Sequence, residues 1–333
     1  MNDTVTLAHG AGGTLYRELI HEVFLPAYGN ALLDPLRDAA VCGAGETIAM
    51  TTDSFVISPL FFPGGDIGRL AVCGTVNDLA VSGAQPRYLT VGMIIEAGFP
   101  VADLKRIAAS LSAAAAEAGV KVVTGDTKVV EKGKCDGIFI NTAGVGVFHH
   151  AFRPLPQKTE AGDVILCSSC LADHGTAVMA SRAGMCFDPA PQSDVRPLAS
   201  LIGALMQSGV ELHAMRDPTR GGAACTLCEF AEDSGTDIIL NPEAVPVKPG
   251  TAQICELLGI DPLTVANEGA VLIALPANQA PRALEVLHSH PFGADAAPIA
   301  EVEAGSGRVL ARTQTGTLRR VLMPAGEILP RIC

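Results

Sequence analysis

TTDSFVISPLFFPGGDIGRLAVCGTVNDLAVSGA, residues 51–84, is the stretch that decides the fold, because its pattern changes from short apolar runs to helical spacing. Two short apolar stretches lie around Asp53, and from Asp66 onward apolar residues recur at the spacing of a helix. We expect this helix to stop at Gly83, since glycine is common just beyond a helix end. Strand-like runs followed by a helix are typical of an α/β protein.

The same alternation continues along the chain. The elements expected beyond this stretch are strands at 87–98, 120–130, 137–148, 163–169 and 269–275, and helices at 102–119, 198–206, 222–230 and 280–290. The pattern breaks at residues 148–164, FHHAFRPLPQKTEAGDV, where two prolines and several charges lie. We therefore predict an α/β (α+β) chain with two domains, residues 1–150 and 151–321, and a flexible tail at residues 322–333.

Composition limits the classes of function. The chain has 333 residues and a net charge of −12, which argues against nonspecific binding to nucleic acid. No apolar run approaches the roughly 18 residues of a membrane helix, and the N-terminus MNDTVTLAHGAGG has no signal-peptide pattern. The 10 cysteines are irregularly spaced, as expected for reduced thiols in the cytoplasm.

Three acidic residues of the first half follow or interrupt apolar segments. They are Asp53 in TTDSF, Asp78 in GTVNDLA and Asp126 in TGDTK. A buried carboxylate without a partner is costly, and shared coordination of Mg²⁺ removes that cost because hard divalent cations take oxygen ligands. The alternative is that they cap helices or form turns, which is common for Asp. Taken together, the three residues favour a magnesium–nucleotide site.

Two glycine-rich stretches are candidates for phosphate binding, because glycine lets backbone N–H groups approach an anion closely. They are HGAGG, residues 9–13, and RDPTRGG, residues 216–222, of which the second opens a helix. Neither matches the P-loop, and GAGGTL fails the dinucleotide fingerprint because Leu15 takes the place of the third glycine. Ordinary glycine-rich loops remain the alternative for each.

Two C-x-x-C pairs, Cys167/Cys170 and Cys225/Cys228, have the spacing of half a zinc site. They lie in apolar stretches and lack the usual knuckle glycines, which favours buried free cysteines. If the pairs did bind zinc, the alternative function would be a zinc-stabilised, non-enzymatic assembly scaffold.

Several motifs, in order along nearly the whole chain, resemble those of the HypE family of hydrogenase maturation factors. They are HGAGG, TTDSFVISPLFFPGGDIGRLAVCGTVNDLAVSGA, GDTKVV, FINTAG, RDPTRGG, NEG and the terminal PRIC. This family belongs to a superfamily with AIR synthase, selenophosphate synthetase and thiamine-monophosphate kinase. The resemblance implies an AIR-synthase-like fold, in which the first sheet pairs with that of a second subunit in a homodimer. A departure is Cys135 in KGKCDG, where a glycine is expected.

The resemblance also implies an activity, ATP-dependent carbamoyl dehydration on the terminal Cys333. Glu268 would remove the amide proton, Lys128 would bind the transferring phosphoryl group, and Mg²⁺ would lie on Asp53, Asp78 and Asp126. The residues that the resemblance assigns to ATP are His9, Gly10, Gly12, Gly13, Asn77, Asp78, Gly125, Asp126, Thr127, Asn141, Asp217, Arg220, Gly221 and Gly222.

A terminal cysteine suits a carrier arm, because a tethered thiol can reach more than one site. The implied partners are HypF as carbamoyl donor and HypC with HypD as cyanide acceptor. Nearby carboxylates are expected to raise the pKa of the Cys333 thiol, with Arg331 partly opposing them. A sister kinase would need no terminal cysteine, and selenophosphate synthetase would need a nucleophile near the first glycine loop, where His9 stands.

Overall fold

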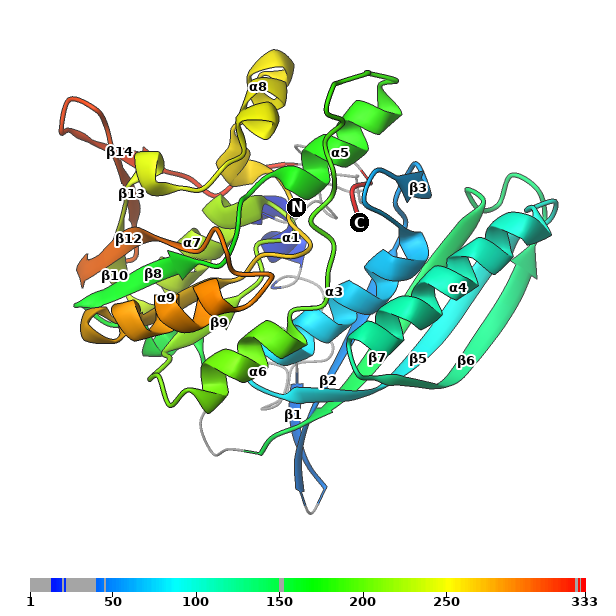
Figure 1. Cartoon of the computed structure of the whole chain (residues 1–333), viewed down its shortest axis with the longest axis horizontal. Coiled ribbons are helices and arrows are strands. Elements are labelled where there is room, and N and C mark those ends of the chain that lie inside the picture. The colour runs from blue at the N-terminus through cyan, green and yellow to red at the C-terminus, as the bar shows by residue number, and fades with distance from the viewer. Residues whose placement is uncertain are drawn as a thin grey trace.

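The computed structural model describes residues 13–19, 21, 40–44, 46–149, 153–326, 329 and 331–333. Its first half contains a five-stranded sheet in the order β1-β2-β7-β5-β6. The strands are β1 (Ala40–Ala44), β2 (Glu46–Phe55), β5 (Gln85–Glu96), β6 (Lys121–Val130) and β7 (Ile138–Val147). Only β5 and β6 pair in parallel. Helices α3 (Ile67–Val81) and α4 (Val101–Glu117) cover one face of this sheet (Figure 1).

Strand β2 contains the first of the two apolar stretches around Asp53 and ends at Phe55, so most of the second stretch lies beyond the strand. The strand is alternating: Ala49 and Phe55 face inward and are buried, whereas Met50 on the opposite face is exposed. Because side chains alternate along a strand, Asp53 shares the face of Phe55. The sheet therefore directs Asp53 toward α3.

Helix α3 is the central element of the first half. The side chain of Asp66 caps it by accepting hydrogen bonds from Gly68 N at 2.8 Å and Arg69 N at 3.1 Å. Its residues are buried almost all round, as expected for a helix packed between two layers. Gly68 permits the contact with α4, since a Cβ there would meet the carbonyl of Ile107 at 2.4 Å.

The second half is a seven-stranded, mostly antiparallel sheet in the order β14-β13-β10-β12-β8-β11-β9. Its strands are β8 (Asp163–Cys167), β9 (Ala214–Arg216), β10 (Thr236–Leu240), β11 (Leu272–Pro276), β12 (Ala297–Ala304), β13 (Val309–Arg312) and β14 (Leu318–Val321). Its helices are α5 (Asp173–Arg182), α6 (Ala199–Gln207), α7 (Gly222–Ser234), α8 (Pro249–Leu258) and α9 (Ala280–Ser289). The alternation predicted from sequence is confirmed, with mixed and not all-parallel sheets.

The two halves share apolar cores. Ala80 and Val81 of α3 pack with Leu198 and Leu201 from the second half. The core of the first half, in turn, takes in Ile332 near the C-terminus. The C-terminal end consequently lies between the halves, close to α5 (Figure 1). In the part of the chain that the structure describes, no helix combines the length and the apolar character needed to cross a membrane.

Candidate active site

The last residues of the chain dock beside residues 56–58 through backbone hydrogen bonds. Val56 N donates to Cys333 O at 3.2 Å, and Ser58 N donates to Arg331 O at 3.3 Å, in antiparallel order. Ile332 between them is only 4% exposed. The structure thus holds the terminal residues in place, and the flexibility predicted for residues 322–333 stays a prediction about a released state.

Side chains from both halves secure the docked tail. His174 Nε2 lies 2.9 Å from Ile332 O, and Arg182 Nη2 donates to Arg331 O at 2.8 Å. Arg331 itself donates from Nε to Val56 O at 2.9 Å and forms an ion pair with Asp136. These contacts fix where the Cys333 side chain lies. Sequence reasoning missed His174 and Arg182, which no motif marks.

The docked thiol lies among charged groups. Burial, together with the charges of Glu268 and Asp53, raises the pKa of Cys333 to about 12, and Arg220 opposes this shift. The expected influence of neighbouring carboxylates is therefore present, but the opposing cation is Arg220. Arg331, which was expected in that role, is instead directed to Asp136. In the docked state the thiol is neutral.

Glu268, the base that the family resemblance implies, lies within electrostatic range of the Cys333 thiol. It stands just before β11, is 2% exposed, and burial raises its pKa well above the usual range. Asp217, Asp194 and Asp53 raise this pKa further, whereas Arg220 lowers it. Carboxylates from both halves therefore surround one point, and a proton or a cation is needed to stabilise them together.

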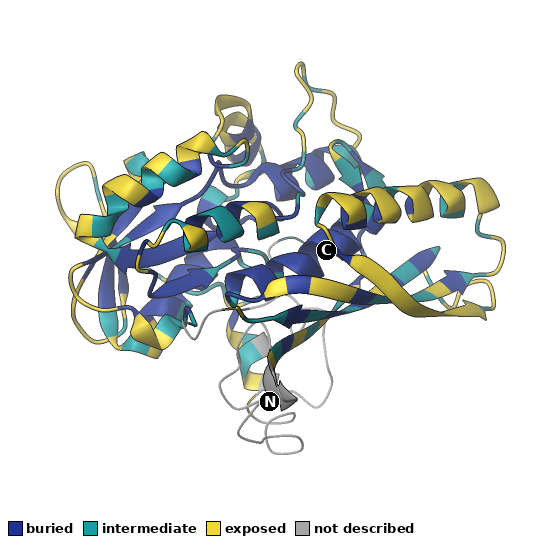
Figure 2. Ribbon diagram, turned by 60° about the horizontal axis from the view of Figure 1, so that its bottom comes forward, coloured by how far each residue is buried: buried dark blue, intermediate teal, exposed yellow. Residues whose placement is uncertain are grey.

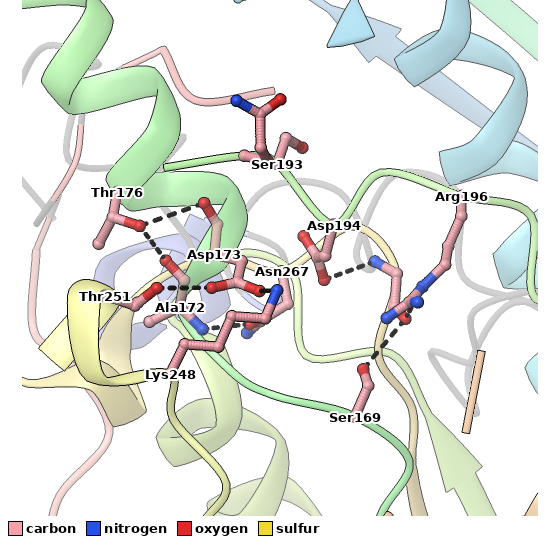
Figure 3. Close-up of polar contacts among 12 residues, drawn as sticks. Ser169, Ala172, Asp173, Thr176, Ser193, Asp194, Arg196, Lys248, Thr251 and Asn267 are labelled. Carbon is pink, nitrogen blue, oxygen red and sulfur yellow. Dashed lines mark hydrogen bonds and ion pairs between the residues drawn. The ribbon is translucent and has the colours of Figure 1, made fainter. Parts of the chain in front are cut away.

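Asp194 is a site residue that sequence reasoning missed. Its Oδ1 accepts from Glu268 N at 3.1 Å and its Oδ2 from Gly269 N at 2.9 Å. Figure 3 labels Asp194 and shows one contact of its carboxylate as a dashed line. Burial raises its pKa to about 6. The residue lies in an irregular segment, SDVRP, so no periodicity or motif singles it out.

Asp53 and Asp78 lie on the same side of α3. A Cβ on Gly74 would lie 3.7 Å from Asp53 Oδ2, and Asp78 follows Gly74 by one helical turn. Thr51 Oγ1 donates to Asp78 Oδ2 at 2.8 Å. The first half therefore offers two oxygen-donor carboxylates on one side of α3, of which Asp53 lies within electrostatic range of Glu268 and Cys333.

Asp126 does not converge with the other two aspartates within one chain, so the predicted triad requires correction. The register places Asp53 opposite Thr142, Thr142 opposite Val91, and Val91 opposite Gly125. Asp126 is therefore three strands away, about 14 Å at the usual strand spacing, and its side chain points to the other face. Lys128 Nζ lies 4.0 Å from Asp126 Oδ2, and both side chains are exposed.

Asn141, Thr127 and Gly125 also belong to this sheet. Asn141 lies on the face away from α3, and its Nδ2 donates to Asp53 O at 2.8 Å and to Ser54 Oγ at 3.0 Å. Thr127 is exposed on β6, and Gly125 allows close strand packing because a Cβ there would meet Val91 O at 2.5 Å. The described contacts of Asn141 and Gly125 are within this sheet.

Asn77 is not available to a nucleotide, which corrects its predicted role. The residue is 0% exposed, and its Nδ2 lies 3.2 Å from Arg196 O and 3.3 Å from Glu268 O. Its Oδ1 accepts from Leu198 N at 2.7 Å. Because its amide is saturated by backbone groups of the second half, Asn77 joins the two halves and places Glu268.

The RDPTRGG loop contributes its side chains and not its glycines. Asp217 and Arg220 lie within electrostatic range of Glu268. Gly222 N donates to Thr219 O at 3.0 Å, and a Cβ on Gly222 would meet Leu263 O at 2.5 Å. Gly221 is the N-cap residue of α7 and has a φ of 78°, in the left-handed region. Both glycines are thus explained by local packing.

The first glycine loop is described only at its end. His9, Gly10 and Gly12 lie outside the described residues. Gly13 begins α1 (Gly13–Leu19), where a Cβ would meet Pro324 O, and Thr14 N donates to the same carbonyl at 3.2 Å. The start of this helix therefore rests on the base of the tail.

The two C-x-x-C pairs do not form a zinc site in the described part of the chain. The one described group of three or more metal-ligating side chains is Glu160, Asp163 and His213, without cysteine. Cys167 and Cys228 belong to the apolar core of the second half. Burial raises the pKa of Cys167 to about 12 and that of Cys228 to about 11, so both thiols are neutral. The buried-cysteine interpretation is favoured.

Comparisons with known proteins identify relatives over the whole chain. Residues 36–148 match the family model "AIR synthase related protein, N-terminal domain", and residues 160–311 match "AIR synthase related protein, C-terminal domain". The chain is 48% identical over 336 residues to carbamoyl dehydratase HypE of Bradyrhizobium diazoefficiens, covering 100% of this chain and 97% of that protein.

Solved structures agree. A HypE–HypF complex contains a chain with 49% identity and a TM-score of 0.88, covering 92% of this chain and 99% of that one. A HypE structure in complex with ATP has 42% identity and a TM-score of 0.84, covering 99% of this chain and 100% of that one.

Proposed function

The chain belongs to the HypE family of AIR-synthase-related proteins, and we propose that it is a carbamoyl dehydratase whose own terminal cysteine carries the substrate. A carbamoyl group on the Cys333 sulfur is dehydrated with ATP to a thiocyanate. The cyanide supplied in this way becomes a ligand of the iron of a nickel–iron hydrogenase during its maturation.

The observation that carries this proposal is the docking of the terminal thiol beside Glu268, Arg220 and Asp53. A small-molecule kinase of the same superfamily would have no use for a terminal cysteine inside its cleft. A carried substrate, in contrast, must be brought to a fixed base and phosphate site, and three backbone carbonyls of the tail are held there.

Dehydration first converts the carbamoyl oxygen into a leaving group. This oxygen attacks the γ-phosphorus of ATP, ADP leaves, and the nitrogen gives up one proton. The carbon–oxygen bond then breaks, so the oxygen departs with its electron pair on inorganic phosphate. The nitrogen loses its second proton, and the carbon–nitrogen triple bond forms. The oxygen of the removed water ends in the phosphate product.

Glu268 is the proposed base for the amide proton. Its raised pKa makes it a stronger base once it is ionised, which suits proton removal from a weakly acidic group. Arg220 favours the ionised form of Glu268 and lies near the thiol as well. It is therefore the side chain best placed to stabilise negative charge on the phosphorylated intermediate.

Mg²⁺ fits the carboxylates of the first half. Asp53 and Asp78 offer hard oxygen ligands on one side of α3, and Asp53 lies in electrostatic range of Glu268. Bound there with ATP, the ion would neutralise phosphate charge. The ATP complex of a relative supports nucleotide binding in this family.

The tail leaves the cleft for the other two steps. A thiol whose pKa is about 12 is a poor nucleophile, so the carbamoyl group is accepted in the released state. The complex of a relative with HypF supports HypF as donor. HypC with HypD is the proposed cyanide acceptor, and the reduced cytoplasm is the proposed location for a chain whose nine described cysteines are all free.

We propose that a second copy of the chain covers the exposed sheet of the first half. Met50, Tyr88 and Ile94 are 44–49% exposed on the sheet face away from α3. Strand β6 is an exposed edge, and such edges invite pairing. We propose a homodimer through this sheet, in which Asp126, Thr127 and Lys128 act at the neighbouring copy's site.

Isotope transfer tests the function directly. The tail is loaded by the donor with a carbamoyl group whose oxygen is ¹⁸O, and ATP is then added. The proposal predicts ¹⁸O in inorganic phosphate, in step with thiocyanate formation. Thiocyanate that forms while the phosphate stays unlabelled would show that the oxygen leaves by another route.

A further inference from the structure

A line of hydrogen bonds connects the docked tail to the second half. His174 of α5 is 0% exposed and lies between two partners, with Nε2 at 2.9 Å from Ile332 O and Nδ1 at 2.8 Å from Ser193 Oγ. A carbonyl can only accept, so the imidazole proton is on Nε2, and Ser193 donates to Nδ1. Burial lowers the pKa of His174 to about 4, which keeps this neutral tautomer at physiological pH.

Ser193 opens the segment 193–196, whose bonds hold Glu268 and Gly269. Asp194 accepts from both of their N–H groups, and Arg196 N donates to Glu268 O at 3.2 Å. Arg196 Nε also donates to Gly269 O at 2.9 Å (Figure 3). Four hydrogen bonds from one short segment therefore fix the backbone that carries the catalytic carboxylate.

The same segment is tied to its surroundings. Ser193 N donates to Pro63 O at 2.9 Å, and Val195 N donates to Ser193 Oγ at 3.1 Å. The imidazole of His174 packs edge-on against Phe62, with ring centroids 5.4 Å apart. The Ser193 hydroxyl thus donates to the histidine and accepts from its own segment, so a shift of either partner is felt by the other.

We propose that His174 and Ser193 are positioning residues for the dehydration step, which couple docking of the tail at Ile332 to the placement of Glu268 by residues 193–196. The carried group and the base are then aligned together, and releasing the tail loosens both. The inference rests on the proposed function for its catalytic consequence, but the coupling itself is a property of the protein alone.

Chemical protection of the terminal thiol tests the first link. Full-length His174→Ala, His174→Gln and Ser193→Ala are treated with iodoacetamide without ATP or donor, and alkylation of the C-terminal peptide is followed by mass spectrometry. We expect about tenfold faster alkylation of Cys333 in His174→Ala, the equivalent of one buried hydrogen bond. His174→Gln restores much of the protection, because its amide can donate to Ile332 O.

Thr176→Val is the matched control. Thr176 is a buried residue of the same helix, and its hydroxyl donates to Ala172 O within the helix, at 2.7 Å. This variant is expected to protect Cys333 as the wild type does. A melting curve accompanies each variant, and Ser193→Ala decides the question if His174→Ala is unfolded.

Amide hydrogen exchange tests the second link. Exchange at Glu268 and Gly269 should be at least about threefold faster in His174→Ala and Ser193→Ala than in Thr176→Val. With the donor and ATP present, these two variants should be carbamoylated at least as fast as the wild type, because the tail is released more often, but dehydrated more slowly.

Three results would overturn the proposal: wild-type alkylation in both variants, unchanged exchange at Glu268 and Gly269, or equal loss of carbamoylation and dehydration. Faster alkylation and exchange in a protein whose wild type never forms thiocyanate would refute the proposed function, while the coupling would stand.

Discussion

Two regions of the proposed site differ in whether one copy of the chain positions all of their side chains. Glu268 and Asp194 are buried, the docked Cys333 is partly buried, and all three are held by hydrogen bonds within one copy. Along β6, Asp126 and Lys128 are exposed, as Figure 2 shows for this edge of the sheet. Burial and bonding position the first set before any ligand arrives. The second set needs another surface.

Glu268→Gln tests the buried region around Glu268, Asp194 and Cys333, and it has the largest expected effect. The amide keeps the side-chain size and the backbone bonds but is not a base, so dehydration should fall about a thousandfold. Carbamoylated protein should accumulate, as measured by mass spectrometry of the C-terminal peptide. Glu256→Gln, an exposed glutamate of α8, serves as control. Normal thiocyanate formation in Glu268→Gln would place the base elsewhere.

Asp53→Asn and Asp78→Asn test the carboxylates between the two halves. Each keeps its shape but loses a charge, and Mg²⁺-dependent ATP turnover should fall about a hundredfold in both. Asp53→Asn should in addition lower the pKa of the docked Cys333 thiol, because Asp53 raises it. The pH dependence of alkylation measures this second effect. Unchanged ATP turnover in both variants would remove the metal assignment.

Mixing two inactive variants tests the exposed region of Asp126 and Lys128 on β6. Asp126→Asn and Glu268→Gln are each expected to be impaired, but a mixed dimer contains one site with both native residues. If subunits exchange freely, half of the dimers are mixed, and activity should recover to about a quarter of the wild-type value. Failure to recover, with mixed dimers verified by native mass spectrometry, would mean that Asp126 does not act at a neighbouring copy's site.

The stability of the protein at acid pH tests the tail's anchor and has the smallest expected effect. His174 has a lowered pKa of about 4, so its contribution is present above about pH 6.5 and is lost as pH falls toward 4. We expect a loss of about 2 kcal/mol between pH 7 and 5 from this group. Asp194, with a raised pKa of about 6, acts in the opposite direction and gains stability as pH falls.

Comparison with His174→Gln isolates the contribution of His174 to the pH dependence of the unfolding free energy, because Asp194 is present in both proteins. The difference in unfolding free energy between the wild type and this variant is measured by urea titration at each pH. A difference that does not change between pH 7 and 5 would show that His174 is not buried in neutral form.

Sequence patterns predicted the elements that depend on local periodicity and the residues that a motif marks. The helix expected from Asp66 to Gly83 is α3 at Ile67–Val81. Motifs marked Glu268 and Cys333, which lie within electrostatic range of one another. Asn77 was assigned wrongly because adjacent helix residues point about 100° apart, so a neighbour of Asp78 faces elsewhere.

The remaining differences arise from contacts between distant segments. The place of Asp126 depends on strand order and register, which its own apolar pattern does not contain. Asp194 and His174 act through backbone groups of residues 74 and 158 positions away. A bond to a backbone group leaves no signature in the residue types of either partner, so sequence reasoning passed over both.

The central claim is that Cys333, docked near Glu268, carries the carbamoyl group. Mass spectrometry of the C-terminal peptide after incubation with HypF, carbamoyl phosphate and ATP tests it most directly. The peptide should gain the mass of a carbamoyl group and then lose that of one water only with hydrolysable ATP, and Cys333→Ala should show neither change. Modification at Cys167, Cys170, Cys225 or Cys228 in place of Cys333 would contradict the account.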